Sequence, residues 1–227
     1  MKDIVNNCEW NFKELEFRLS SLCDHIRVLT SEKVKVTFNI DRGSWIDVIN
    51  NTIKANKIDI VLIGQQGRFY QRRKMNFNPD KIAEKTNIPV LTIPENRRIT
   101  KLYSVVIPIT DFLPVRKLMY GLYIAAWYDT TIKLLAVSTA GAESKARHYQ
   151  NLSKEIINSN CGVKIELETA DSENVAEAVN EYSMLCAADL VILNPGSQTR
   201  LPGLLSRLFT KIIQKYSAPP VLTVNPG

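Results

Sequence analysis

Apolar residues recur along this chain with two different periods, and each period predicts a type of secondary structure. Between residues 10 and 29 they return every three or four positions, which places them on one face of a helix. In the segment Val34–Ile40 (VKVTFNI) apolar and polar residues alternate, as they do in a half-buried strand. Short apolar runs such as Asp59–Ile63 predict buried strands.

On this basis, strands and helices alternate over the whole chain. We predict helices at residues 10–29, 45–56, 79–86, 115–128, 143–158, 173–187 and 202–216. We predict strands at residues 34–40, 59–63, 90–93, 103–109, 131–137, 163–168, 189–193 and 221–224. This alternation is typical of an α/β fold, in which helices wrap a parallel sheet.

The chain also contains an internal repeat, which three sequence anchors indicate. VKVTFNI at Val34 matches VKIELE at Val163, and Asp59 matches Asp189. The tetrapeptide Pro-Val-Leu-Thr occurs at residues 89–92 and again at residues 220–223. The three offsets are 129, 130 and 131 positions. Such a regular spacing predicts two copies of one strand–helix module.

The two copies are unequal in length. The second begins with a strand and a helix, residues 103–128, that have no counterpart in the first. We therefore predict domains at residues 1–97 and 98–227, the first of them lacking its initial strand and helix. Either the chain is the C-terminal piece of a longer polypeptide or the first copy is naturally short. In both cases the first copy should expose an apolar sheet edge that something must cover.

Composition places the chain in an ordinary class. Hydrophobic residues make up 45% and charged residues 23%, with a net charge of +6. No apolar run is long enough to span a bilayer, and the polar N-terminus does not resemble a signal peptide, so we expect a cytoplasmic location. Four cysteines without a C-x-x-C pair and only two histidines predict no metal site.

Basic residues cluster in one predicted loop, at Arg68, Arg72, Arg73 and Lys74, with aromatic residues between them. Phosphates, an anionic lipid surface and single-stranded nucleic acid are alternatives for such a loop. We favour a solvated loop and predict no nucleic-acid partner. His25 and His148 lie on predicted helices without a catalytic partner, and we find no catalytic set.

Several stretches resemble the universal stress protein family. They are VVIPITD at Val105, ADLVILNPG at Ala188 and PPVLTV at Pro219, with IDIVLIGQQG at Ile58 and IPVLTI at Ile88. The resemblance implies two Rossmann-like, doubly wound parallel sheets of the adenine nucleotide alpha hydrolase-like type, with strand order 3-2-1-4-5 and the first sheet incomplete. It also implies pairing through the last strand, here between the two repeats of one chain, or a homodimer.

Many members of that family bind ATP through a loop that reads G-x-x-G, then nine residues, then Gly with Ser or Thr. Gly64–Gly67 keeps the first half, but Phe77 and Asn78 replace the second. In the other copy Asn194-Pro195-Gly196-Ser197 stands for the first half, and Arg207 and Leu208 for the second. The family's acidic residue falls on Thr110, with Asp111 next. The candidate nucleotide-binding residues are Gly64, Gln65, Gly67, Arg68, Thr110, Asp111, Val137, Asn194, Gly196 and Ser197.

Because both loops are degenerate, we assign no cofactor, and binding of ATP or another adenine nucleotide stays open. An ATP-hydrolysing enzyme is disfavoured for the same reason. The resemblance predicts a non-catalytic regulatory or ligand-sensing protein. The alternative is the cytosolic C-terminal regulatory domain of a cation/proton antiporter, with the membrane transporter in the same polypeptide.

Overall fold

The computed structural model describes residues 12–31, 33–65, 78–94, 97–138, 143–160, 162–196 and 219–226. The chain divides into two compact units, Met1–Val48 and Ile49–Gly227. None of the described helices combines the length and the apolar character that crossing a bilayer needs.

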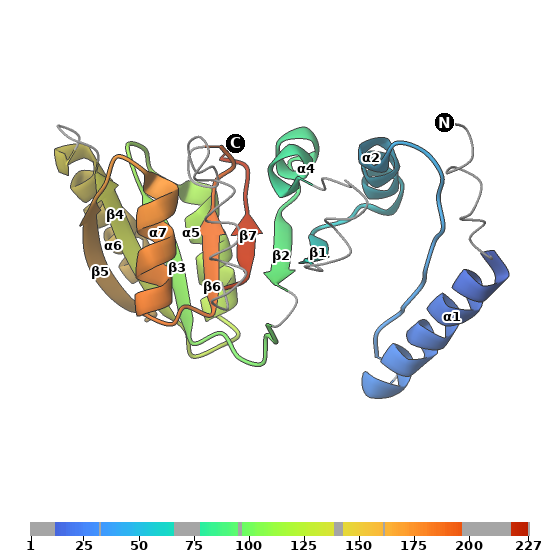
Figure 1. The fold of residues 1–227 in the computed structure, drawn as a ribbon. Helices are drawn as coiled ribbons and strands as arrows, with labels where there is room; N and C mark the ends of the chain where they lie inside the picture. Colours follow the sequence, from blue (N-terminus) through green and yellow to red (C-terminus); the bar gives the residue numbers. More distant parts are fainter. Residues whose placement is uncertain are drawn as a thin grey trace. The chain divides into compact units, whose positions relative to one another are not determined.

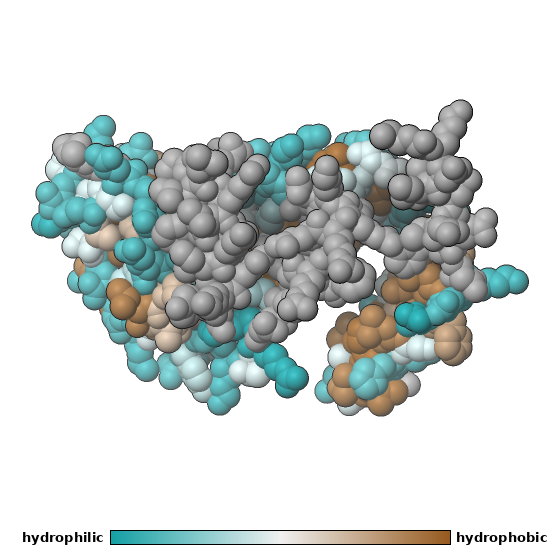
Figure 2. Space-filling model, in the orientation of Figure 1, coloured by the Kyte–Doolittle hydropathy of each residue, from teal (hydrophilic) through white to brown (hydrophobic). Residues whose placement is uncertain are grey.

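The unit Met1–Val48 contains helix α1 (Phe12–Leu29), an extended segment and the start of helix α2 (Trp45–Asn56). Cys23 is the buried residue of α1. Apolar side chains gather on the surface of this helix (Figure 2), and the exposed ones are Phe12, Phe17, Leu22, Val28 and Leu29.

The predicted strand Val34–Ile40 is a correction, because this segment forms no strand and most of its residues are exposed. A strand is held by backbone hydrogen bonds to a neighbour. In the predicted strand order this segment would pair with a second strand, and the described residues of Met1–Val48 contain none. The guanidinium of Arg27 instead donates to the carbonyl of Val36 at 2.7 Å.

The unit Ile49–Gly227 is built on one seven-stranded sheet (Figure 1). In spatial order its strands are β1 (Val61–Gln65), β2 (Val90–Pro94), β7 (Val221–Thr223), β6 (Leu190–Leu193), β3 (Ser104–Ile109), β4 (Thr131–Ser138) and β5 (Lys164–Asp171). The five strands β5-β4-β3-β6-β7 are mutually parallel and have the predicted order 3-2-1-4-5.

The two expected sheets are joined edge to edge. β1 and β2 are parallel to each other, but β2 pairs antiparallel with β7 over three residues, from Val90 opposite Thr223 to Thr92 opposite Val221. This junction makes one continuous sheet of the two halves. The predicted domain boundary at residue 97 stays a prediction.

Helices cover both faces of the sheet in the second half of the chain. α5 (Val115–Ala125) and α6 (Glu143–Asn160) lie on one face, and α7 (Val175–Leu185) lies on the other (Figure 1). The first core gathers Leu118 and Ile157 against strand residues such as Ile107. Helix α5 approaches β3 closely at Gly121, where an added Cβ would come within 2.8 Å of the Ile107 side chain.

Helix α4 (Pro79–Thr86) packs against β2 and β7, with Ile82 and Ala83 fully buried. Pro79 occupies the first helical position, where its missing N–H costs nothing. The helix ends at Asn87, whose φ of 59° is left-handed. The predicted helix at residues 202–216 lies outside the described residues.

Candidate functional site

The antiparallel junction separates the candidate residues into two groups. In open α/β sheets, ligands bind beyond the carboxyl ends of the strands. The carboxyl ends of β3, β4, β6 and β7 lie together, and we call this end of the sheet the β3–β6–β7 edge. Those of β1 and β2 lie at the opposite end, because β2 and β7 run in opposite directions. Thr110, Asp111, Val137, Asn194 and Gly196 therefore belong to one edge, and Gly64 and Gln65 to the other. Gly67, Arg68 and Ser197 lie outside the described residues.

Gly64 and Gln65 do not form the predicted turn. They continue strand β1, where Gly64 pairs with Ile93 and Gln65 with Pro94 of β2. The strand runs two residues beyond the apolar run because β2 offers backbone partners as far as Pro94. No atom of the described residues lies within 4 Å of the position that a Cβ on Gly64 would take, so their packing does not require glycine there.

At the other edge, Asn194 and Gly196 follow strand β6 and shape its end. Asn194 is buried, and its side-chain amide donates to the carbonyl of Val224 at 2.7 Å, which ties the end of β6 to the end of β7. Gly196 has a φ of 92°, a left-handed conformation that favours glycine. Its N–H donates to the Asp80 carboxylate at 3.4 Å. A carboxylate from the first half thus lies on the glycine turn of the second.

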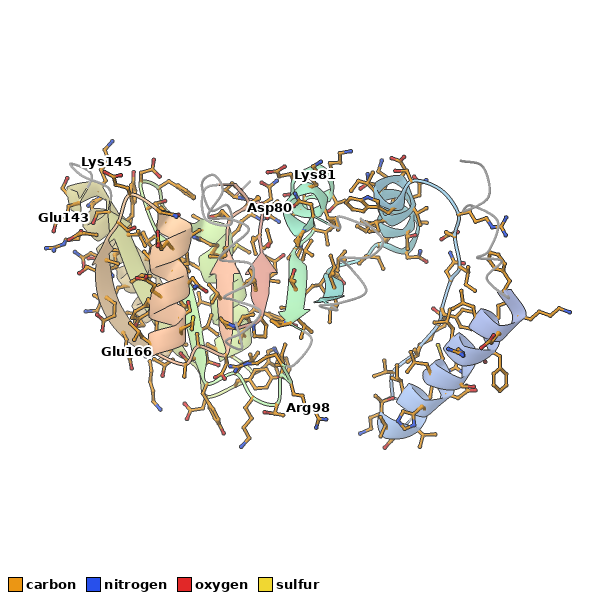
Figure 3. The ribbon with its side chains drawn as sticks, viewed as in Figure 1. Asp80, Lys81, Arg98, Glu143, Lys145 and Glu166 are labelled. Atoms are coloured by element: carbon orange, nitrogen blue, oxygen red, sulfur yellow. The ribbon has the colours of Figure 1, made fainter. Side chains whose placement is uncertain are left out.

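Asp80 reaches this turn from the first turn of α4, on the side of the helix nearer to β7 (Figure 3). Its side chain is buried. Asn78 caps the same helix, and its side-chain oxygen accepts from the backbone N–H groups of Asp80 and Lys81. Asn is among the best N-cap residues. The cap uses the amides that an anion would otherwise meet.

Arg116 joins the two halves at the same edge. Its guanidinium donates to the side-chain and backbone oxygens of Asn87 and, at 3.0 Å, to the carbonyl of Asn225. The Asn225 amide also donates to the Asn87 side chain at 3.2 Å. Because Asn87 ends α4, the cation lies at the negative end of that helix.

Lys117, the next residue, is fully buried, and its ammonium group donates to the carbonyl of Pro108 near the end of β3. Burial lowers the pKa of Lys117 from 10.5 to about 7, because the charged form is disfavoured away from water. Sequence reasoning missed both cations. The available signal was two adjacent basic residues in the first turn of a helix, where positive charge opposes the helix dipole.

The remaining candidates contribute less to this edge. Thr110 is half-buried, Asp111 is exposed, and Val137 is part of the second hydrophobic core. Asp189, by contrast, has a structural role at the opposite edge, where its carboxylate accepts from the backbone amides of Tyr103 and Ser104 at 2.9 and 3.1 Å. Among the described residues, no group of three or more His, Cys, Asp or Glu could hold a metal ion.

The described groups at the β3–β6–β7 edge are therefore mainly hydrogen-bond donors: Arg116, Lys117 and the N–H of Gly196. Among the described residues, the Asp80 carboxylate accepts from one of these donors, the N–H of Gly196. Such a set can hold an anion by hydrogen bonds and charge, and Asp80 holds that position within the molecule.

Comparison with known proteins gives the fold. No protein-family model matches the chain, and no curated protein matches it. A universal stress protein from Archaeoglobus fulgidus DSM 4304 superposes with a TM-score of 0.70 at 14% identity, covering 100% of this chain and 83% of that one. A functionally unknown protein, PA1789 from Pseudomonas aeruginosa PAO1, gives 0.58 at 14% identity and coverages of 91% and 77%.

The cytoplasmic domain of a prokaryotic cation chloride cotransporter is also similar, with a TM-score of 0.57, 12% identity and coverages of 93% and 80%. The chain therefore has the α/β fold of the universal stress proteins, and the predicted resemblance is confirmed at the level of the fold.

Proposed function

We propose that this chain is a non-catalytic regulatory or ligand-sensing protein of universal stress protein type. Its ligand is an anion, with an adenine nucleotide as the first candidate, bound at the β3–β6–β7 edge. One observation carries the proposal: the N–H of Gly196 bonds to a carboxylate that belongs to the other half of the chain. The turn at Gly196 binds a negatively charged group, and in the structure that group is the Asp80 carboxylate.

A ligand phosphate at Gly196 would compete with Asp80 for the same N–H. Displacing Asp80 changes the contacts of α4, and α4 is also held at its other end by Arg116. Binding at the turn is thereby linked to the packing of the first half against the second. A ligand shifts an equilibrium between two arrangements by the difference in its affinity for them. This gives a sensing role without any chemical step.

The degenerate loops fit this role better than they fit catalysis. The side-chain oxygen of Asn78 accepts a hydrogen bond in the α4 cap, and the side-chain amide of Asn194 donates one that ties β6 to the end of β7. Both positions serve the fold. The proposed ligand is therefore held by the turn and the nearby cations, with no group assigned to activate water.

The experiment is a titration with ATP, ADP and cyclic AMP, followed by the thermal unfolding temperature, on the natural chain and on Asp80→Ala. A ligand at about 100 times its Kd adds about 2.7 kcal/mol of stability. We expect tighter binding by Asp80→Ala, because its internal competitor is gone. Glu84→Ala is the matched control, since it removes the same charge from an exposed position of the same helix.

If neither the natural chain nor Asp80→Ala responds to millimolar nucleotide, the nucleotide is not the ligand. If both Asp80→Ala and Glu84→Ala bind more tightly to the same extent, the effect is one of net charge, and the competition at Gly196 is wrong.

We also infer that the two halves are a duplicated module, divided at residues 97 and 98. Shared pairing supports this inference: Leu62 lies opposite Leu91 in β1 and β2, and Ile192 lies opposite Leu222 in β6 and β7. The β2–β7 junction then pairs the last strands of the two repeats within one chain. A measured monomer would agree with this internal pairing, and a homodimer held through β7 would contradict it.

The second candidate function is the cytosolic C-terminal regulatory domain of a cation/proton antiporter. The similarity to the cytoplasmic domain of a cation chloride cotransporter supports it. Both candidates imply a cytoplasmic location. The reading frame upstream of Met1 separates them, because a run of transmembrane helices in frame supports the transporter, whereas an in-frame stop codon removes it.

A further inference from the structure

Strands β6 and β1 differ in their neighbours within the sheet. In the second half, β6 has β7 on one side and β3 on the other, with Val105 opposite Leu190 and Val106 opposite Val191. In the first half, β1 has β2 on one side. Among the described residues, no strand pairs with the other side of β1, which is the outermost strand of the sheet.

Side chains at equivalent positions record the same difference. Leu190 and Ile192 of β6 are 3% and 0% exposed, because they lie in the core beneath α5. Ile60 and Leu62 occupy the matching positions before and within β1, and they are 40% and 61% exposed. Pairing of Leu62 with Leu91, and of Leu91 with Leu222, places these residues on the face of the sheet that α5 covers elsewhere.

A third observation concerns the acidic residue before each strand. Asp189 precedes β6, and its carboxylate accepts from the backbone amides of Ser104, the first residue of β3, and of Tyr103 just before it. Asp59 precedes β1 at the equivalent position and is exposed, and it has no hydrogen bond to another described residue. Asp189 thus anchors the start of β3 beside β6, whereas Asp59 is present beside β1 without a strand to anchor among the described residues.

The edge of β1 also lacks the usual protection against a new strand. Its sequence, VLIGQ, contains no charged residue and no proline. The N–H of Val61 donates to Pro89 on the β2 side at 3.0 Å. Because backbone groups alternate in direction along a parallel strand, the N–H and carbonyl groups of Leu62 and Gly64 point to the open side.

We propose that the outer edge of β1, with Ile60 and Leu62 beside it, is a docking site for a strand–helix segment of another polypeptide. The strand adds in parallel next to β1, with its first amides on Asp59, and the helix covers Ile60 and Leu62. The segment β3–α5 is the template, since it makes these same contacts with β6. This proposal concerns an interaction surface and is independent of the proposed ligand.

A second copy of this chain is a poorer occupant. Two β1 strands related by a two-fold axis would pair antiparallel, whereas β6 shows a parallel neighbour. Such a pair would also leave Asp59 without strand amides at its position and would bring no helix over Leu62. The required partner is a short run of β-branched or aliphatic residues followed by an amphipathic helix, added by strand augmentation.

The test uses the full chain and a defined probe, a carrier protein that displays residues 101–129 of this sequence, the β3–α5 segment, with a scrambled version as control. Binding is measured by titration, and amide exchange by NMR. We expect saturable binding that slows exchange of the Leu62 and Gly64 amides by about tenfold or more. Leu62→Asp should weaken binding about tenfold or more, since it puts a charge into an apolar contact, and Asp59→Ala should weaken it less.

Leu185→Asp is the matched control, because Leu185 is 86% exposed on α7 and should leave binding unchanged. Absence of binding, or binding that Leu62→Asp does not weaken, overturns the proposal. So does slow exchange of the Leu62 amide in the free monomer, which would mean that the chain covers its own edge. Sedimentation of the free protein completes the test: a dimer that Leu62→Asp dissociates would assign the edge to a second copy.

Discussion

Two segments of nearly the same sequence pattern behave in opposite ways in this protein. Residues 164–171 form β5, which pairs with β4 over eight residues, from Lys164 opposite Thr131 to Asp171 opposite Ser138. The matching segment Val34–Ile40 forms no strand. β5 has a neighbour within the same unit, and Val34–Ile40 has none among the described residues of Met1–Val48.

Strand formation in these two segments is therefore decided more by the presence of a neighbouring strand than by the sequence of the segment itself. Alternating Val, Thr and Phe fit a pleated, half-buried surface, but that preference has meaning only where such a surface exists. The helix α1, which precedes Val34–Ile40, formed as predicted because its hydrogen bonds are internal. A helix such as α1 can therefore form without a neighbouring element, whereas a strand needs a partner, as β1 has in β2.

The largest expected effect comes from damaging the strand that supports β5. Leu134 of β4 is fully buried and lies opposite Leu167 of β5. Leu134→Ala should lower the free energy of unfolding by about 2–5 kcal/mol, through lost burial and a cavity. Phe38→Ala, in the segment without a partner, should cost less than about 1 kcal/mol. Urea denaturation measures both, and equal losses would break the comparison.

The second effect is a pH dependence located on α5, a helix that has no counterpart among the described residues of the first half. Lys117 has a pKa of about 7 in the folded protein and 10.5 as a free side chain. Between these values the unfolded chain binds more protons than the folded one, so the free energy of unfolding rises with pH. Below pH 7 the contribution of Lys117 to the free energy of unfolding is at its lowest and no longer changes with pH.

We expect the free energy of unfolding to rise by roughly 2 kcal/mol from pH 7 to pH 9, with a slope below 1.4 kcal/mol per pH unit. Lys117→Met keeps the length of the side chain without the charge and should flatten this rise. Denaturation curves at several pH values provide the measurement. A rise that persists unchanged in Lys117→Met would show that other groups cause it.

The third effect is local and makes β5 more like Val34–Ile40. The Gln150 side chain of α6 is buried and donates to the carbonyls of Leu134 in β4 and Glu168 in β5, each at 2.7 Å. Gln150→Ala should cost about 1–3 kcal/mol, because it leaves the buried carbonyl of Leu134 and the half-buried carbonyl of Glu168 without this donor. Hydrogen exchange should speed up most over residues 168–171. Uniform exchange across the sheet would contradict a local role.

The smallest effect is expected at the surface of the same strand pair. Lys133 of β4 forms an ion pair with Glu166 of β5, and the glutamate side chain is about half exposed. Glu166→Gln should change the free energy of unfolding by less than about 1 kcal/mol, and the change should shrink further as salt is added. A loss comparable to that of Gln150→Ala would mean that surface charge, rather than buried pairing, holds β5.

Much of the fold could be predicted because it depends on local pattern. Helices α2 and α4 have the predicted bounds, and the second half has the predicted strand order. The turn at Gly64 was wrong because the end of β1 depends on how far β2 offers partners, which is not written in β1 itself. The fusion of the two sheets follows from three residue pairs of β2 and β7.

The site was harder to predict than the fold. The glycine turn at Gly196 was found from its sequence, but its partner Asp80 lies 116 positions away. Arg116 and Asn87 likewise meet across 29 positions, and neither residue belongs to the predicted nucleotide-binding loop. Such pairs depend on where α4 packs. Local pattern predicts that α4 exists and does not predict which side chains its two ends will meet.

The position of β7 has a consequence for how the protein is made. β7 comes last among the strands along the chain, yet it lies third in the sheet, between β2 and β6. During synthesis, the strands β1–β2 and β3–β6 therefore emerge from the ribosome before β7, the strand that joins them. The sheet closes when residues 221–223 are released, so a nascent chain halted shortly before them holds two unjoined edges that are open to aggregation.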